Sequence, residues 1–239
     1  MLKILQQFIP ASLKNKLKKE LGVPDQEYTF KRLKTLGYQP KLALDIGAYE
    51  GNWAASFSAI FSEAKIMMLE GQESKRIILQ QKATANKQLD FRIALLGSAE
   101  QEVEFNIYET ASSVLKENNE TNAKTEIRTL ATLDQLLINT PFAQPDFIKI
   151  DTQGYELEIL KGAEKTIQQA VFILLEVSLI DIYKNCPLVA QVIAYMQTLD
   201  FVLYDICSLM RRPYDKALYQ SDFLFVKEAS PFRANKQWI

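Results

Sequence analysis

The chain has 239 residues, of which 48% are apolar and 24% are charged, so it suits one large α/β domain and excludes a disordered or collagen-like chain. A formal net charge of -1 disfavours a general binder of nucleic acid, and the absence of histidine excludes His-based triads, His-ligated zinc and histidine general bases. Two cysteines, Cys186 and Cys207, are too few for a disulfide scaffold. We expect both cysteines to be buried. Because no secretory signal or membrane-spanning run is visible, we expect a cytoplasmic protein.

Residues 1–38 predict an N-terminal helical extension. In residues 1–22, leucine and isoleucine recur at near-helical spacing among lysines, and Pro10 is expected to break this helix into two pieces. Such a segment suits an arm that packs on its own domain or on a second subunit. It also suits a basic amphipathic helix in peripheral contact with an anionic membrane, and both interpretations remain open. Residues 26–38 predict a second helix, closed by Gly37.

Residues 39–239 predict a single domain in which short apolar runs alternate with longer amphipathic segments. This alternation is typical of a Rossmann-like, mainly parallel open sheet with helices on both faces. We expect strands at 41–46, 65–70, 90–96, 145–151, 171–177, 201–209 and 222–228, and helices at 51–61, 73–86, 155–170 and after Pro187.

The alternation lapses around residues 98–130. Residues 102–109 alternate apolar and polar side chains with a period of two, whereas residues 115–133 are polar and lack a long apolar face. This pattern predicts an inserted β-hairpin followed by a loop. Long loops of this kind often cover active sites.

Four carboxylates lie at the carboxyl ends of predicted strands: Asp45, Glu70, Asp151 and Glu176. Because ligands of an open parallel sheet bind beyond the carboxyl ends of its strands, we expect these four acids to face one crevice. Taken singly, each would also suit a helix cap or a solvated turn. Glu70 lies 19 residues after Gly51, where an acid hydrogen-bonds the hydroxyls of an adenosine ribose, so it predicts a nucleoside cofactor.

The glycine turn after the first strand narrows the choice of cofactor. A dinucleotide fingerprint that starts at Gly47 needs glycine where this chain has Tyr49 and Asn52, and a P-loop needs a following GK[ST]. NAD is therefore disfavoured. S-adenosylmethionine carries an ammonium and has no phosphate, and it suits a turn that begins with an acid, here Asp45, and continues with Gly47 and Gly51.

The segment DFIKIDTQGYELEILKGAE, residues 146–164, resembles the signature K-I-D-x-x-G-x-E-x-x-x-L-x-G-A of the FkbM family of S-adenosylmethionine-dependent methyltransferases. Further segments resemble this family in the same order, from LALDIGAYEG at 42–51 to LYQSDFLFV at 218–226. The resemblance covers about residues 30–228. It implies a class I methyltransferase fold with a seven-stranded sheet.

The resemblance also implies which residues bind the cofactor. Ala94 would lie near the adenine, and Glu70 would bind the ribose. The chain departs from the family at Tyr49, where asparagine is usual, and at Gly71, where proline is usual. Tyr49 would narrow the pocket near the methionine end or stack on the ligand. The expected cofactor contacts are Asp45, Gly47, Ala48, Tyr49, Gly51, Glu70, Gly71, Ala94 and Asp151.

Methyl transfer from a sulfonium is an in-line displacement, so much of the catalysis comes from positioning the acceptor oxygen, and an alcohol acceptor also loses a proton. Asp151 is expected to be the base or a metal ligand, with Glu156 and Glu176 as its catalytic partners. Glu156 would equally suit the first turn of a helix, and Glu176 a contact at a strand end. An oxygen-only group of Asp151, Glu176 and Asp222 would suit Mg²⁺ or Mn²⁺ rather than zinc.

Several other residues have two interpretations that remain open. Lys149 either pairs with an acid or extends its stem along apolar surface. Trp53 and Phe57, one helical turn apart, suit a helix core or a stacking platform. Arg211 and Arg212 suit an anionic acceptor, such as a sugar phosphate or uronate, or else a solvated loop.

The leading hypothesis is a methyltransferase that acts on a hydroxyl oxygen of a sugar, glycan or secondary metabolite, with no nucleic-acid partner. Two other functions are considered. The first is a non-catalytic relative that serves as a binding module in a glycan-assembly complex, against which the intact acids argue. The second is an NAD-dependent oxidoreductase, which the missing glycines weaken.

Overall fold

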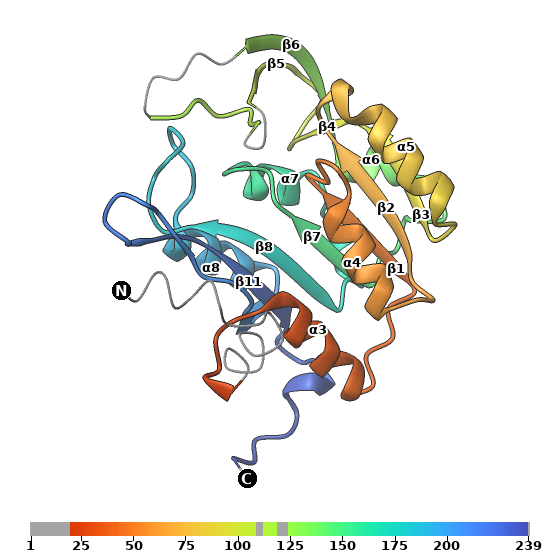
Figure 1. Cartoon of the computed structure of the whole chain (residues 1–239), viewed down its shortest axis with the longest axis vertical. Coiled ribbons are helices and arrows are strands. Elements are labelled where there is room, and N and C mark those ends of the chain that lie inside the picture. The colour runs from red at the N-terminus through yellow and green to blue at the C-terminus, as the bar shows by residue number, and fades with distance from the viewer. Residues whose placement is uncertain (1–19, 109–111, 119–123, 239) are drawn as a thin grey trace, which may run out of the picture.

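The computed structural model describes residues 20–108, 112–118 and 124–238. The amphipathic segment expected within residues 1–22 therefore lies almost wholly outside the described residues. A central sheet runs through the molecule (Figure 1) in the order β10-β11-β8-β7-β1-β2-β3, with β9 paired to β11. Its strands are β1 (Leu42–Ile46), β2 (Lys65–Glu70), β3 (Leu89–Ile93), β7 (Phe147–Ile150), β8 (Phe172–Ser178), β9 (Phe201–Ile206), β10 (Met210–Arg211) and β11 (Leu218–Lys227).

The predicted mainly parallel sheet is confirmed. Strands β3, β2, β1, β7 and β8 are parallel to their neighbours, whereas β11 is antiparallel to β8 and to β9. The two-residue strand β10 is an eighth strand that the sequence pattern does not predict. The strand expected over 201–209 is shorter, because β9 ends at Ile206. Because β1 has β2 and β7 on its two sides, the carboxyl ends of these three strands meet at one edge.

Helices cover both faces because successive side chains of the buried strands point to opposite faces. Ala43 packs with Phe30, Phe57 and other residues of one apolar cluster, whereas Leu44 packs in a second cluster on the other face. The first cluster includes residues of α3 (Gln26–Thr35), α4 (Asn52–Ile60) and α5 (Arg76–Ala85). The second includes residues of α6 (Leu133–Leu137), α7 (Glu156–Lys161) and α8 (Val189–Thr198).

Helix α3 begins at a capping residue, Asp25, whose carboxylate accepts a hydrogen bond from the Tyr28 backbone N–H. Its Phe30 ring makes edge contacts with Trp53, 6.0 Å between centroids, and with Phe57, 5.2 Å. Trp53 and Phe57 therefore belong to an aromatic cluster that joins α3 to α4, in keeping with their interpretation as helix-core residues. No helix within the described ranges is long and apolar enough to cross a membrane.

The predicted insertion forms a second sheet, seen at the top of Figure 1. Strand β5 (Glu102–Ile107) is antiparallel to β6 (Lys124–Ala131), as in the expected hairpin, but β6 occupies residues that the polar sequence assigns to a loop. The strand expected over 90–96 divides at Ala94. Its last two residues, β4 (Leu95–Leu96), leave the central sheet and pair with β6.

The prediction of a single helix over 155–170 is wrong. The segment is divided into α7 and a 3-10 turn, η2 (Thr166–Gln169), and α7 ends at Lys161 with Gly162 as its C-terminal capping residue. A β-carbon on Gly162 would lie 2.1 Å from the Gly97 carbonyl oxygen, so two backbone segments touch there. Tertiary packing therefore ends the helix where the apolar pattern would let it continue. There are two further 3-10 turns. The turn η1 (Glu73–Lys75) precedes α5, and the turn η3 (Pro231–Arg233) follows β11.

Candidate functional site

A cavity of about 240 Å³ opens at the carboxyl ends of β1, β2 and β7. Six of the predicted cofactor contacts line it, namely Gly47, Tyr49, Glu70, Gly71, Ala94 and Asp151. Asp45, Ala48 and Gly51 are buried but do not line it. The other lining residues include the apolar Leu95, Leu96 and Ile159, the polar Gln72, Thr152 and Gln153, and Ser112–Val114 of the insertion.

The glycine turn is held against both neighbouring strands. The backbone N–H groups of Gly47 and Ala48 donate to the Leu69 carbonyl oxygen on β2, at 2.9 and 3.1 Å. Gly47 has φ +76°, and a β-carbon there would lie 1.8 Å from the Asp151 carbonyl oxygen after β7. The turn therefore requires glycine for two reasons, its left-handed backbone and the approach of another backbone.

Tyr49 also has a left-handed backbone, with φ 50°. Asparagine adopts this conformation more readily than most residues, which gives a physical reason for the asparagine that the resemblance places here. The Tyr49 ring lies beneath the Lys75 ammonium, 3.6 Å from the ring centroid, and Lys75 pairs with Glu50 at 3.3 Å. Tyrosine is therefore less favourable than asparagine in this backbone conformation, but its ring gains a cation–π contact with Lys75 beside the cavity.

Glu70 is held by the backbone on both sides. Its Oε2 accepts the Tyr49 N–H at 2.7 Å, and its Oε1 accepts the Gln72 N–H at 2.8 Å. Burial raises the pKa of Glu70, and these two backbone hydrogen bonds oppose that shift. Each carboxylate oxygen keeps a lone pair that can accept a further hydrogen bond, as the hydroxyls of a ribose require.

Asp45 is fully buried and faces Lys149. The Lys149 Nζ lies 3.1 Å from Asp45 Oδ1, and within the described residues neither Asp45 oxygen has a hydrogen bond of ordinary geometry. Burial raises the pKa of Asp45, and Lys149 opposes the rise. The structure therefore places Asp45 as the partner of Lys149, and the predicted contact with the cofactor ammonium stays a prediction.

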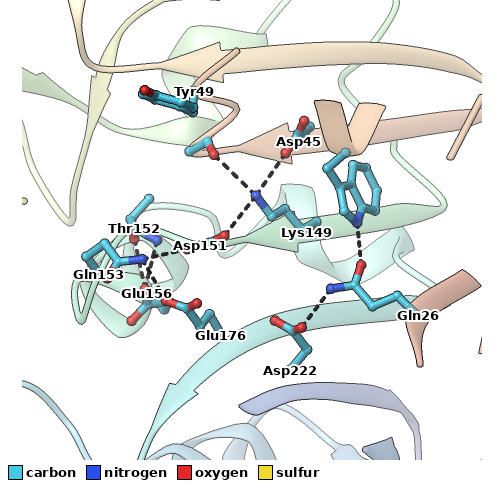
Figure 2. A network of polar contacts seen from close by, with 12 residues as sticks. Gln26, Asp45, Tyr49, Lys149, Asp151, Thr152, Gln153, Glu156, Glu176 and Asp222 are labelled. Carbon is cyan, nitrogen blue, oxygen red and sulfur yellow. Dashed lines mark hydrogen bonds and ion pairs between the residues drawn. The ribbon is translucent and has the colours of Figure 1, made fainter. Parts of the chain in front are cut away.

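Asp151 and Glu176 are bridged by an amide that the sequence analysis overlooks. The Gln153 Nε2 donates to Asp151 Oδ1 at 3.1 Å and to Glu176 Oε2 at 2.7 Å (Figure 2). The Gln153 Oε1 in turn accepts the Tyr183 hydroxyl at 3.0 Å, and Gln220 donates to Glu176 at 2.7 Å. Burial, followed by the neighbouring carboxylates, raises the pKa of Glu176 well above its usual range.

Glu156 organises the loop after β7. Its Oε1 accepts the backbone N–H groups of Thr152, at 2.8 Å, and Gly154, at 3.1 Å. Burial raises the pKa of Glu156 to about 7, although these hydrogen bonds act in the opposite direction. Because this carboxyl faces the loop from behind the cavity wall, we interpret Glu156 as a group that shapes the loop around Asp151.

Asp222 connects to the N-terminal helix. The Gln26 Nε2 donates to Asp222 Oδ2 at 2.7 Å, and the Gln26 Oε1 accepts the Trp53 indole N–H at 2.8 Å (Figure 2). Gln26 thus joins α3, α4 and β11 beside the acids. Its position before the predicted domain gave no signal of this role, because it is 196 residues from Asp222.

Each of the predicted metal ligands is hydrogen-bonded or ion-paired to another side chain of the protein. Asp151 contacts Lys149 and Gln153, Glu176 accepts two amide N–H groups, and Asp222 accepts one. Within residues 20–108, 112–118 and 124–238, no three His, Cys, Asp or Glu side chains are grouped so that they could hold a metal ion. The predicted oxygen-only ligand set is therefore not assembled.

The basic pair of the β10–β11 turn is occupied by local contacts. Arg212 donates to both carboxylate oxygens of Asp215, at 2.7 and 2.6 Å, and Arg211 donates to the Lys216 carbonyl oxygen at 2.9 Å. Both guanidinium groups shape this turn, which favours the interpretation as a loop over one as an anion site.

The insertion is attached to the loop that carries Asp151. Ser113 donates through its hydroxyl to the Gln153 carbonyl oxygen at 3.0 Å, and its backbone pairs with that of Asn106 on β5. Farther along, the Asn118 N–H donates to the Ile182 carbonyl oxygen at 2.7 Å. Residues 112–118 therefore connect β5 to the loop after β8 and form part of the cavity wall.

Comparisons with known proteins bear on the family and the fold of the chain. Residues 45–203 match the family model described as the methyltransferase FkbM domain. The crystal structure of methyltransferase FkbM from Methylobacillus flagellatus KT superposes with a TM-score of 0.51 and 18% identity, over 77% of this chain and 43% of that one. A precorrin-6y C5,15-methyltransferase from Geobacter metallireducens GS-15 superposes with a TM-score of 0.50 and 11% identity, over 85% and 87% of the two chains. No curated protein has significant sequence similarity to the chain.

At these identities the superpositions show a shared fold, and the chain spans less than half the length of the Methylobacillus protein. The family match, by contrast, covers more than half of this chain and includes the glycine turn, Glu70, Asp151 and Glu176. The chain therefore belongs to the FkbM family of S-adenosylmethionine-dependent methyltransferases.

Proposed function

We propose that the protein transfers a methyl group from S-adenosylmethionine to the oxygen of a hydroxyl group, on a sugar, glycan or secondary metabolite. The observation that carries this proposal is the position of Asp151. Asp151 and Glu70 are the two strand-end acids that line the cavity, but Glu70 is buried, whereas the Asp151 side chain is 30% exposed. A carboxylate that reaches both the cavity and solvent can accept the proton of an entering alcohol.

The cavity fits the proposed cofactor at two places. Glu70 offers carboxylate lone pairs to ribose hydroxyls, and Ala94 and Leu95 offer an apolar surface to the adenine. When bound, the cofactor supplies a sulfonium-activated methyl group.

The residues around Asp151 assist the reaction by holding this carboxylate in place. Gln153 donates to its Oδ1, and Lys149 lies 3.3 Å from its Oδ2, so the carboxylate keeps a fixed orientation while one edge remains open to the cavity. Phe105 and Val114 from the insertion add apolar side chains to the cavity lining. A neutral hydroxyl acceptor suits this site better than an anionic one. Arg211 and Arg212, which could bind an anion, instead hydrogen-bond to residues of the β10–β11 turn.

Binding is tested first, by calorimetry with S-adenosylhomocysteine and by melting temperatures measured with S-adenosylhomocysteine, NAD and NADP. We expect S-adenosylhomocysteine alone to bind and to raise the melting temperature. Glu70→Gln should weaken binding at least about tenfold, since it replaces a charged acceptor, while the exposed acid variant Glu63→Gln serves as the control. A response to NAD alone, or none to S-adenosylhomocysteine, contradicts the proposal.

The acceptor atom is tested next. The protein is incubated with methyl-labelled S-adenosylmethionine and fractionated metabolites and glycans, and the labelled fraction is treated with mild base. An O-methyl ether keeps its label, whereas a methyl ester releases labelled methanol. Retained label that resides on nitrogen or carbon would show a methyltransferase with a different acceptor.

A further inference from the structure

Lys149 lies at the centre of the site but behind the cavity wall. Its side chain is 8% exposed, and on β7 it is the register partner of Asp45 on β1. Like Phe147 two residues earlier, it lies on the face of the sheet that α3 and α4 cover. Lysine is rarely buried to this extent without partners, so its contacts indicate its role.

The Lys149 ammonium has three oxygens around it. Its Nζ lies 3.1 Å from Asp45 Oδ1, 3.2 Å from the Gly47 carbonyl oxygen and 3.3 Å from Asp151 Oδ2 (Figure 2). The ammonium donates a hydrogen bond to the Gly47 carbonyl oxygen and forms ion pairs with the two carboxylates. Because these three oxygens come from the end of β1, the glycine turn and the end of β7, the role of Lys149 is to join protein segments.

The charge of this ammonium is secured by its neighbours. Burial acts to lower the pKa of Lys149, but Asp151 and Asp45 outweigh burial and raise it. Lys149 is therefore protonated at neutral pH. Asp45 depends on this charge because it is fully buried, whereas Asp151 also has Gln153 and partial exposure to solvent.

We propose that Lys149 is a positioning residue for methyl transfer, whose ammonium ties the Asp151 carboxylate to the glycine turn that carries the cofactor. The inference rests on the proposed function and adds to it a fixed geometry between the proton acceptor and the cofactor wall. Without Lys149, Asp151 Oδ2 loses its contact with β1 and the turn, and Gln153 holds only the other oxygen. Small displacements of this kind reduce the rate of an in-line transfer far more than they reduce binding.

The test separates this role from simple neutralisation of Asp45. Lys149→Met alone leaves a buried carboxylate without its cation, and this variant is expected to melt at a lower temperature or fail to fold. The double variant Lys149→Met with Asp45→Asn removes both charges together. Its matched reference is Asp45→Asn alone, which keeps the Lys149 contacts with Gly47 and Asp151.

Three quantities are compared between the double variant and its reference: the affinity for S-adenosylhomocysteine, the rate of label transfer at saturating S-adenosylmethionine, and amide hydrogen exchange in residues 47–54 and 151–156. We expect the double variant to fold, to lose at least about ten times more in transfer rate than in affinity, and to exchange faster in both segments. Equal rates and equal exchange in the two variants overturn the inference. Failure of the wild-type protein to bind S-adenosylhomocysteine instead overturns the proposed function.

Discussion

Gly47 and Asp151 are in backbone contact, since a β-carbon on Gly47 would lie 1.8 Å from the Asp151 carbonyl oxygen. The turn after β1 and the end of β7 therefore form one continuous wall of the cavity. Gly47→Ala must separate the two segments and also place alanine in a left-handed conformation. We expect it to weaken S-adenosylhomocysteine binding by at least about tenfold and to lower the melting temperature.

Gly37→Ala is the matched control for Gly47→Ala. Gly37 also has a left-handed backbone, with φ +91°, but nothing lies within 4 Å of the position of its added β-carbon. The control should therefore show the backbone cost of about 1 kcal/mol and retain full affinity. If calorimetry finds equal affinities for the two variants, the contact with Asp151 is not important for the cavity.

Glu176 is expected to act as a neutral group. Burial and neighbouring carboxylates raise its pKa well above the usual range, and the partners of its Oε2 are two amide N–H groups. Glu176→Gln keeps the size and neutrality of a protonated carboxyl, so the rate of label transfer should stay within about threefold of wild type. Asp151→Asn removes the proton acceptor and should lower that rate by about a hundredfold or more. Equal losses in the two variants would show that Glu176 acts as an ionised catalytic partner.

Removal of divalent cations is expected to leave label transfer unchanged. The three acids predicted as ligands are each hydrogen-bonded or ion-paired to protein groups, and the described part of the chain offers no three-ligand cluster. The measurement compares initial rates after exhaustive EDTA treatment with rates after Mg²⁺ or Mn²⁺ is restored. A rate that falls with EDTA and returns with one of these ions would restore the predicted metal site.

The sequence predicts those features that depend on local patterns. The five parallel strands follow from short apolar runs. The grouping of acids at the ends of β1, β2, β7 and β8 follows from the rule that ligands bind at the carboxyl ends of strands. The partners of these acids could not be predicted in this way. Gln153 reaches two acids because its backbone has φ 57°, and Gln26 arrives from a helix far away in the sequence. Both contacts depend on tertiary packing.

Gln26 shows how strongly the N-terminal helix is coupled to the site. Gln26→Leu keeps similar volume but removes a hydrogen bond from the buried Asp222 carboxylate and another from the Trp53 indole N–H. Loss of such partners costs about 1 to 3 kcal/mol for each buried group. We expect the free energy of unfolding in urea to fall by about that amount, with Gln81→Leu on the exposed surface of α5 as the control. Unchanged stability would show that α3 contributes only apolar contacts.

Glu156 makes stability depend on pH in a defined direction. Its pKa rises from 4.5 to about 7 in the folded protein, chiefly because it is buried. The folded state therefore binds this proton more tightly than the unfolded state does. The resulting stabilisation is fully present below about pH 4.5 and is lost as the pH rises to about 7, with no further loss above that.

Glu156→Gln removes this titration while its amide oxygen can still accept the Thr152 and Gly154 N–H groups. The free energy of unfolding of wild type minus that of the variant should fall between pH 4.5 and 7, by on the order of 3 kcal/mol, because each pKa unit corresponds to about 1.4 kcal/mol. Urea unfolding of both proteins at several pH values measures this difference, and the exposed acid variant Glu63→Gln should give a flat line. A difference that rises with pH would mean that the loop prefers the ionised carboxylate, and Glu156 would then support the loop as a charged acceptor of its N–H groups rather than as a neutral one.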